Sequence, residues 1–183
     1  DSFGIQLWTV RDFMEQNAVS TLEKLGEYGY QEIESFQGDK GVFWALSPKE
    51  FKNVLDSNGL KCTSSHTDSQ YALDPKREDE FKKLVDDAAE IGVRYLINPY
   101  LKFLETKDDF KRAAEGFSRL GEITNARDIK YGYHNHDYSF QKLDGEYPQD
   151  IMMQGTDADK VEFEMDVYWV VTAGQDPVEW FEK

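Results

Sequence analysis

The sequence predicts an α/β fold, a (β/α)8 TIM barrel of which about six βα units are present in the 183 residues. Short apolar runs alternate with amphipathic helical stretches at roughly 30-residue spacing, the pattern of successive βα units. The turn after the first strand, residues 9–12, has no glycine, so the glycine-rich nucleotide-binding turn of a doubly wound sheet is absent. Long polar and aromatic stretches follow several strands, as in the loops of a barrel.

A complete barrel has eight strands and about 250 residues. This chain of 183 residues is therefore expected to be one barrel domain, residues 1–183, without its last two units. An open barrel leaves two edge strands, which are prone to pair with other chains. A homo-oligomer is therefore a possible state.

Each expected strand is a short apolar or alternating run bounded by glycine, proline, asparagine or aspartate. The helices between them show apolar residues three and four positions apart. Ser47, with Pro48 next and Glu50 three residues on, predicts a capping box at the start of one helix. The expected strands are residues 3–9, 30–35, 60–65, 93–98, 129–135 and 161–167, and the expected helices are 19–28, 47–57, 75–91, 106–128 and one that starts at 176.

Composition excludes several classes of function. A net charge of -15 repels phosphate backbones and anionic membranes, so neither nucleic acid nor a membrane surface is an expected partner. No apolar run approaches the roughly 20 residues that span a bilayer. The one cysteine, Cys62, cannot form an intramolecular disulfide. The first strand begins almost at residue 1, so both a cytoplasmic and a periplasmic location stay open.

Alternation of side chains along the strands brings chemically active residues to one end of the barrel. In strand 129–135 the tyrosines face the helices, while His134 and His136 face inward. In strand 161–167 the apolar set likewise faces outward. Barrel chemistry lies at the carboxyl ends of the strands. The residues expected there are Trp8, Glu34, His66, Asn98, His134, His136, Asp166 and Tyr168, which include all three histidines of the chain.

Each of these residues also has a structural explanation. Glu34 could serve only as an ion-pair partner, and the rings of Trp8 and Tyr168 as core. Two unpaired imidazoles in a core are costly, so the histidines two apart favour a functional site. Glu162 and Glu164 lie deeper along their strand and are interpreted as structural.

Three segments resemble the sugar phosphate isomerase/epimerase family of xylose-isomerase-like barrels. They are FGIQLWTVRD near the start, KYGYHNHDYSF in the middle and EMDVYWVVTAGQDPVEWFEK at the end. The resemblance implies a divalent metal held by strands five to eight, with Asp166 as the strand-six ligand and His136 as the strand-five ligand. Ser139 stands where the family has a glutamate, and the ligands of strands seven and eight have no counterpart.

The expected function is a metal-dependent isomerase or epimerase of a sugar or keto-sugar derivative, acting through an enediolate. A divalent Mn, Zn, Co or Mg ion would stabilise the enediolate while a carboxylate moves the proton. Glu34 and His66 are the expected catalytic residues, and the expected substrate-binding residues are Trp8, Asn98, His134 and Tyr168.

The expected partner is a small sugar, and an unphosphorylated one, because the two plausible phosphate-binding side chains, Arg11 and Lys102, are expected to be solvated. Two alternatives stay open: a sugar or inosose dehydratase on the same barrel, and a carbohydrate-binding barrel with a degenerate site. An endonuclease of abasic DNA is disfavoured by the charge of -15.

Overall fold

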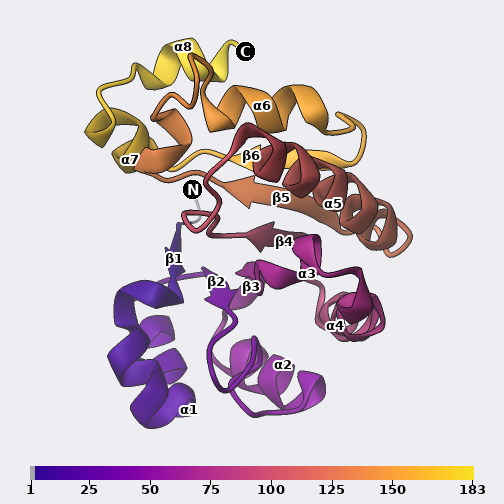
Figure 1. The fold of residues 1–183 in the computed structure, drawn as a ribbon. Coiled ribbons are helices and arrows are strands. Elements are labelled where there is room, and N and C mark those ends of the chain that lie inside the picture. The colour runs from indigo at the N-terminus through magenta and orange to yellow at the C-terminus, as the bar shows by residue number, and fades with distance from the viewer. Residues whose placement is uncertain (1–2) are drawn as a thin grey trace.

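A computed structural model describes residues 3–183 and confirms a parallel sheet of six strands with helices packed against it (Figure 1). Each strand pairs in parallel with the next along the chain, as in a barrel. Within the described residues β1 and β6 do not pair with each other, so the sheet is open. The strands are β1 (Gly4–Gln6), β2 (Glu32–Phe36), β3 (Lys61–His66), β4 (Tyr95–Asn98), β5 (Lys130–His134) and β6 (Val161–Glu164).

The helices follow the strands and cover one face of the sheet, with α1 and α2 at one end and α5 and α6 at the other (Figure 1). At α2 the Ser47 hydroxyl accepts a hydrogen bond from the Glu50 backbone N–H at 3.3 Å, which confirms the predicted capping box. The helices are α1 (Arg11–Glu27), α2 (Pro48–Ser57), α3 (Gln70–Leu73), α4 (Glu78–Ile91), α5 (Lys107–Asn125), α6 (Pro148–Gly155), α7 (Val167–Thr172) and α8 (Pro177–Phe181). Short 3-10 turns occupy Leu7–Val10, Pro75–Arg77 and Asp137–Phe140.

Two predicted boundaries were wrong in ways that affect the site. Strand β6 ends at Glu164 and not at residue 167, because Asp166 caps the next helix: its Oδ1 accepts a hydrogen bond from the Trp169 backbone N–H at 3.1 Å. The first helix begins at Arg11 and not at residue 19, so it follows the first strand almost directly. Helix α6 lies between the predicted strands 129–135 and 161–167, where no helix was predicted.

The core lies between the sheet and the helices. Tyr131 and Tyr133 of β5 are fully buried against Phe117 of α5, with ring centroids 5.8 and 5.6 Å apart. This confirms that the tyrosines of β5 face the helices, and it leaves the alternate residues of β5 facing inward.

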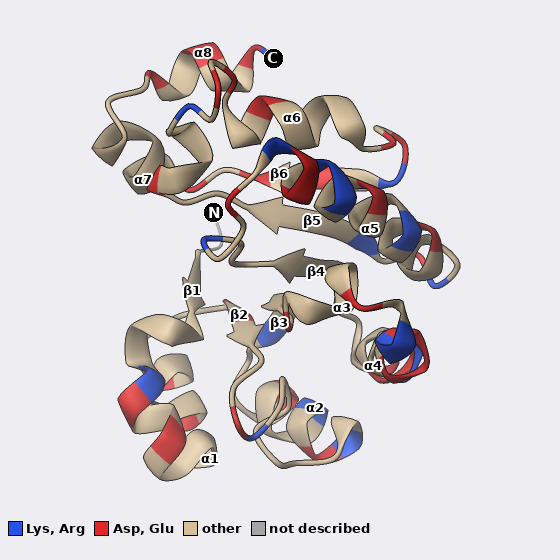
Figure 2. Cartoon of the chain, viewed as in Figure 1, with Lys and Arg blue, Asp and Glu red and all other residues tan. Residues whose placement is uncertain are grey.

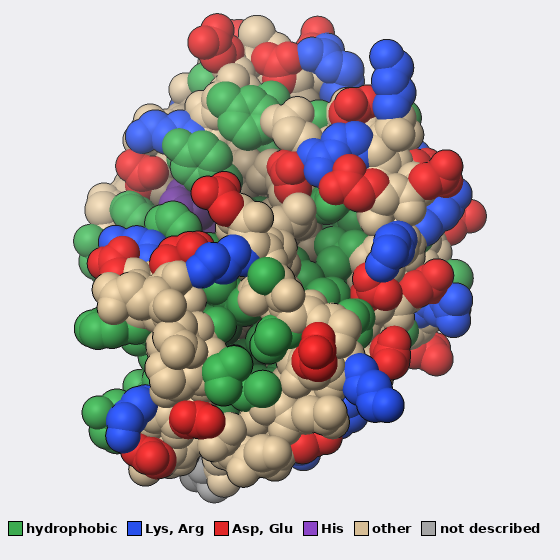
Figure 3. Space-filling model, turned by 90° about the horizontal axis from the view of Figure 1, so that it is seen from below, with side chains coloured by type: hydrophobic (Ala, Val, Ile, Leu, Met, Phe, Trp, Pro, Cys, Tyr) green, Lys and Arg blue, Asp and Glu red, His purple; other side chains and the backbone are tan. Residues whose placement is uncertain are grey.

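Charged side chains are concentrated on the outer helices, with both signs interspersed (Figure 2). On one face of the molecule, apolar side chains gather between charged ones, and a histidine is visible beside them (Figure 3). Among the described residues, no helix combines the length and the apolarity that a membrane crossing requires.

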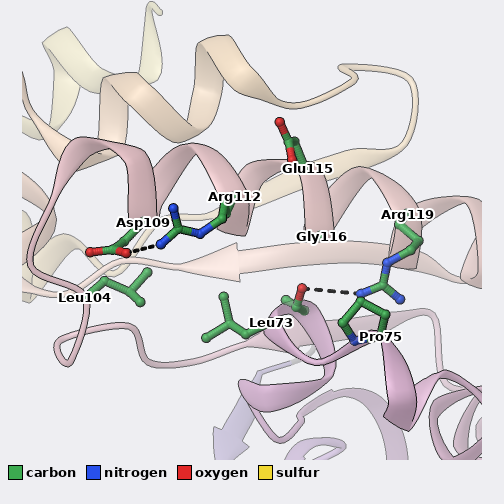
Figure 4. Close-up of a pocket in the computed structure, with 9 residues that line it drawn as sticks. Leu73, Pro75, Leu104, Asp109, Arg112, Glu115, Gly116 and Arg119 are labelled. Carbon is green, nitrogen blue, oxygen red and sulfur yellow. Dashed lines mark hydrogen bonds and ion pairs between the residues drawn. The ribbon is translucent and has the colours of Figure 1, made fainter.

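A groove on the outer surface runs between α3 and α5 and is lined in part by Gly116 and Leu73 (Figure 4). Three of its charged side chains, Asp109, Arg112 and Arg119, are already engaged. Arg119 donates hydrogen bonds to the backbone oxygens of Tyr71 and Ala72 at 3.1 and 3.3 Å, and Arg112 pairs with Asp109. The groove is therefore interpreted as a packing feature and not as a candidate functional site.

Replacing Gly116 by alanine is expected to destabilise the fold by about 3 kcal/mol, because the packing there leaves no room for a methyl group. A Cβ at this position would lie 2.0 Å from the backbone oxygen of Ala72, which the Arg119 side chain also holds. Urea unfolding followed by circular dichroism measures the loss. Glu115→Ala, on the exposed face of the same helix, is the control and should change stability by about 0.5 kcal/mol or less. Equal stability of both variants would contradict the close packing of α3 on α5.

Candidate functional site

A pocket of about 450 Å³ opens at the carboxyl ends of the strands, within the range of about 300–1,000 Å³ typical of small-molecule sites. Its aromatic walls and polar groups come from the ends of the strands and the loops that follow them. The lining residues are Gln6, Trp8, Thr9, Phe36, Gln37, His66, Thr67, Pro99, Tyr100, His134, His136, Asp166 and Trp169.

At its base, His66 lies between two carboxylates. His66 is the last residue of β3, and its Nε2 lies 3.1 Å from Glu34 Oε1 and 3.2 Å from Glu164 Oε2. The Ser64 hydroxyl donates a hydrogen bond to Glu34 at 2.5 Å and helps to hold that carboxylate in place. The side chains of His66 and Glu34 are only 12% and 13% exposed, so their interaction is poorly screened by water.

His134 extends this cluster toward the pocket opening. It is the last residue of β5, and its Nδ1 lies 2.7 Å from Glu164 Oε2. Its Nε2 lies 3.4 Å from Asp166 Oδ2. The five residues therefore alternate carboxylate and imidazole in one continuous series: Glu34, His66, Glu164, His134 and Asp166. In such a series, imidazole groups that can carry a proton lie next to carboxylates that can accept one.

Burial and hydrogen bonds within this cluster shift the pKa values of His66 and Glu164. Burial alone would lower the pKa of His66, but its hydrogen bonds to Glu164 and Glu34 outweigh burial and raise that pKa to about 9. Burial would likewise raise the pKa of Glu164, but the hydrogen bonds from His134 and His66 hold it well below its usual range. A pKa of about 9 favours the protonated form of His66 at neutral pH, where its ring lies between the carboxylates of Glu34 and Glu164.

The pKa of His136 is shifted downward, in the direction opposite to that of His66. Its ring packs against Tyr138 and Trp169, with centroids 5.6 and 5.2 Å away. Burial, followed by the nearby charge of His134, lowers the pKa of His136 to about 4, so the ring is neutral at physiological pH. Its Nδ1 is buried and has no hydrogen-bond partner among the described residues. A ligand in the pocket could supply that partner.

Gln6 presents a second buried polar atom to the pocket. It ends β1, and its Oε1 accepts a hydrogen bond from the Trp8 backbone N–H, which fixes the orientation of the amide. The Nε2 of Gln6 is buried without a partner in the described part of the chain. Gln6 also pairs in register with Glu34 on β2, so it lies beside the carboxylate cluster.

Comparison with known proteins identifies the fold family. A sequence model of the xylose isomerase-like TIM barrel matches residues 22–183. The chain belongs to the xylose isomerase-like TIM barrel family. The predicted resemblance is thereby confirmed.

One solved structure, that of a sugar phosphate isomerase/epimerase from Parabacteroides distasonis, is 33% identical, with a TM-score of 0.82 over 99% of this chain and 70% of that one. A curated inosose dehydratase from Lacticaseibacillus casei is 25% identical over 96% of this chain. The chain spans 64% of the length of that dehydratase. A family member from Mycobacterium smegmatis, solved in complex with magnesium, is 16% identical with a TM-score of 0.67, over 92% of this chain and 63% of that one, and shares the fold.

The structure of this xylose isomerase-like barrel brings most of the predicted site residues together. Glu34, His66, His134 and Asp166 form the cluster described above, and His136 and Trp8 line the pocket above it.

Asn98 does not lie in the pocket. It is fully buried on the helix side of the sheet, where it pairs in register with Tyr133 and its Oδ1 accepts a hydrogen bond from Ser69 at 3.1 Å. Its neighbour Ile97 pairs with Gly132 and takes the inward position. The inward placement predicted for Asn98 was wrong because Leu96 and Ile97 are both apolar, and alternation alone does not say which of them faces in.

Tyr168 was also predicted to face into the barrel, and it does not. Because β6 ends at Glu164 and α7 begins at Val167, the Tyr168 side chain lies on a helix and is 67% exposed. Trp169, the next residue, lines the pocket in its place.

Glu164, Gln6 and Trp169 are the residues that sequence reasoning left out of the site. The alternation pattern did place Glu164 inward, on the same face as Asp166. It was interpreted as deep and structural because the strand was extended to residue 167, whereas Glu164 is the last residue of β6. The signal that could have corrected this is Asp166 itself, a good helix N-cap two residues after the strand.

The donor atoms present suit a divalent metal. One nitrogen each of His66 and His134 and one oxygen of Glu164 lie within 4.8 Å of one another, close enough to share one ion. Mixed imidazole and carboxylate ligands are typical of Mn, Zn and Co sites. This xylose isomerase-like barrel therefore has a donor set that fits the metal expected from its sequence, at a position deeper than His136.

Proposed function

We propose that the protein is a metal-dependent isomerase or epimerase of an unphosphorylated sugar or keto-sugar derivative. The observation that carries the proposal is the alternating series of carboxylates and imidazoles at the carboxyl ends of the strands, the end of a barrel where catalysis occurs. The names of similar proteins, an isomerase/epimerase and an inosose dehydratase, support carbohydrate chemistry.

In this proposal His66, His134 and Glu164 hold the ion, and Asp166 completes or orients the set through His134. A divalent ion bound there would act as a Lewis acid toward the sugar carbonyl and its neighbouring hydroxyl. His66 must give up its proton to become a ligand, so metal binding would release that proton to solvent.

Glu34 is the proposed base. Its carboxylate lies 3.1 Å from His66, which lines the pocket, and Ser64 and His66 hold that carboxylate in a defined position. Removal of a proton from the carbon next to a carbonyl requires such a positioned carboxylate. Return of that proton to the neighbouring carbon, or to the other face of the same carbon, would complete isomerisation or epimerisation.

The pocket favours an uncharged sugar. None of the side chains lining it, among residues 3–183, is a lysine or an arginine, and three carboxylates lie at or near its base. A phosphate group would meet these carboxylates without a lysine or arginine in the lining to pair with. The Gln6 amide and His136 Nδ1 are proposed to bond to sugar hydroxyls, while Trp8 and Trp169 provide apolar walls.

A dehydratase is the second candidate, favoured by the similarity to inosose dehydratase over 96% of this chain. The same base and the same donor set would serve it. The reaction would differ only after proton removal, when a hydroxyl leaves as water instead of the proton returning.

Exchange of sugar protons with solvent tests the proposal. The protein is incubated with Mn²⁺ in D₂O with ketohexoses, aldohexoses, their phosphates and an inosose, and each sugar is examined by NMR. We expect deuterium next to the carbonyl of an unphosphorylated sugar, no deuterium after treatment with EDTA, and recovery when Mn²⁺ is returned. Loss of water from the inosose would favour the dehydratase. Absence of any reaction across the panel would leave a binding barrel as the better explanation.

A further inference from the structure

Two aromatic rings at the edge of the pocket are partly exposed. Tyr100 is 44% exposed and Phe103 is 47% exposed, and their centroids lie 6.5 Å apart. Both belong to the loop between β4 and α5. A pair of apolar rings held at the surface beside a pocket is a mark of a binding surface.

The loop that carries these rings is anchored. Leu101 is fully buried, and its backbone N–H donates a hydrogen bond to the Tyr138 hydroxyl at 2.6 Å. The Leu104 backbone N–H donates to the Leu101 oxygen at 2.9 Å and closes a turn that displays Phe103. The Tyr100 backbone N–H donates to Asn98 at 3.3 Å. Because the backbone is held on both sides of each ring, the rings are presented in a fixed position, which lowers the entropy cost of binding.

The exposed rings are continuous with the pocket. Tyr100 itself lines the pocket, and its ring meets His136 edge-on at 5.7 Å. Phe103 does not line the pocket, and its ring centroid lies 6.5 Å from that of Tyr100. A molecule that fills the pocket and extends out of it over Tyr100 would come within reach of Phe103.

We propose that Tyr100 and Phe103 form a second subsite, which stacks against a ring joined to the sugar in the pocket, so that the substrate is a glycoside rather than a free monosaccharide. This rests on the proposed function of the pocket as a sugar site. The apolar C–H face of a pyranose or the face of an aromatic aglycone complements an exposed aromatic ring. An uncharged second ring also suits a chain with a net charge of -15.

Binding of matched sugar pairs tests the subsite. Trp8 and Trp169 line the pocket, so their fluorescence can follow binding. The intact protein, with Mn²⁺, is titrated with D-glucose, cellobiose and maltose, and with D-galactose and lactose. We expect at least one disaccharide to bind about tenfold more tightly than its monosaccharide, as stacking on one or two rings would give. Phe103→Ala should reduce that advantage to about twofold or less and leave monosaccharide affinity within about twofold.

Tyr28→Ala is the matched control, because Tyr28 is an aromatic residue 73% exposed at the end of α1, which leads into the opposite end of the sheet. It should leave all affinities unchanged. If monosaccharides bind but no disaccharide binds more tightly, or if the advantage survives in Phe103→Ala, the subsite is wrong and the proposed function stands. If no sugar binds, both fail. If Phe103→Ala only changes the mass of the particle in solution, the rings are a protein contact and the subsite is overturned.

Discussion

Replacing Glu34 by glutamine is expected to lower kcat for sugar proton exchange by about 10²- to 10⁴-fold, the contribution of a positioned general base. The substitution keeps the shape of the side chain and its ability to bond to Ser64, which now contacts Glu34 at 2.5 Å. It removes the carboxylate that would take the proton. KM and metal content should change little, because Glu34 is not one of the three donors that can share an ion.

Glu32→Gln is the matched control. Glu32 lies two residues earlier on β2, faces the same side of the strand and contacts the Thr63 hydroxyl at 2.7 Å, away from the histidines. Its replacement should leave kcat within a few-fold of the wild type. Full activity in Glu34→Gln would remove Glu34 from the mechanism. A parallel loss of metal would mean that Glu34 acts as a ligand instead of a base.

The sequence was sufficient to predict the fold because the helical spacing of apolar residues and the short apolar strand runs follow each other regularly over most of its length. The helix caps and the apolar runs set the order of the elements, and β5 shows how far alternation can reach: buried tyrosines on one side leave His134 on the other. The same logic placed Glu34 and His66 at the same end of the barrel, and the structure puts these side chains 3.1 Å apart.

The alternation of side chains did not predict their orientation correctly at the ends of β4 and β6. In β4 two successive apolar residues, Leu96 and Ile97, carry no alternating signal, so the orientation of Asn98 could not be determined. At the end of β6 the capping hydrogen bond of Asp166 starts a helix and changes the direction of every side chain after it. Distances between strands distant in the sequence, such as that from His66 to Glu164, depend on sheet curvature, which no local pattern encodes.

Replacing Glu164 by glutamine is expected to weaken Mn²⁺ binding by on the order of 100-fold or more, because loss of a ligand should exceed the 10- to 100-fold cost of losing a ligand's supporting partner. Glu164 is the group that joins the two histidines, at 3.2 Å from His66 and 2.7 Å from His134, so no other carboxylate in the series can replace it in both contacts. Metal content after dialysis, measured by mass spectrometry, and calorimetric titration with Mn²⁺ give the loss directly.

Glu162→Gln provides the comparison for that loss, since Glu162 lies on the same strand and its side chain is 53% exposed near Lys130. It should bind Mn²⁺ as the wild type does. Asp166→Ala separates the two possible positions of the ion. If Asp166→Ala abolishes binding while Glu164→Gln does not, the ion lies at the outer position beside His136, as the family resemblance implies. If Glu164→Gln abolishes binding and Asp166→Ala only weakens it, the ion lies at the deeper position between the ends of β3, β5 and β6, directly beside the proposed base.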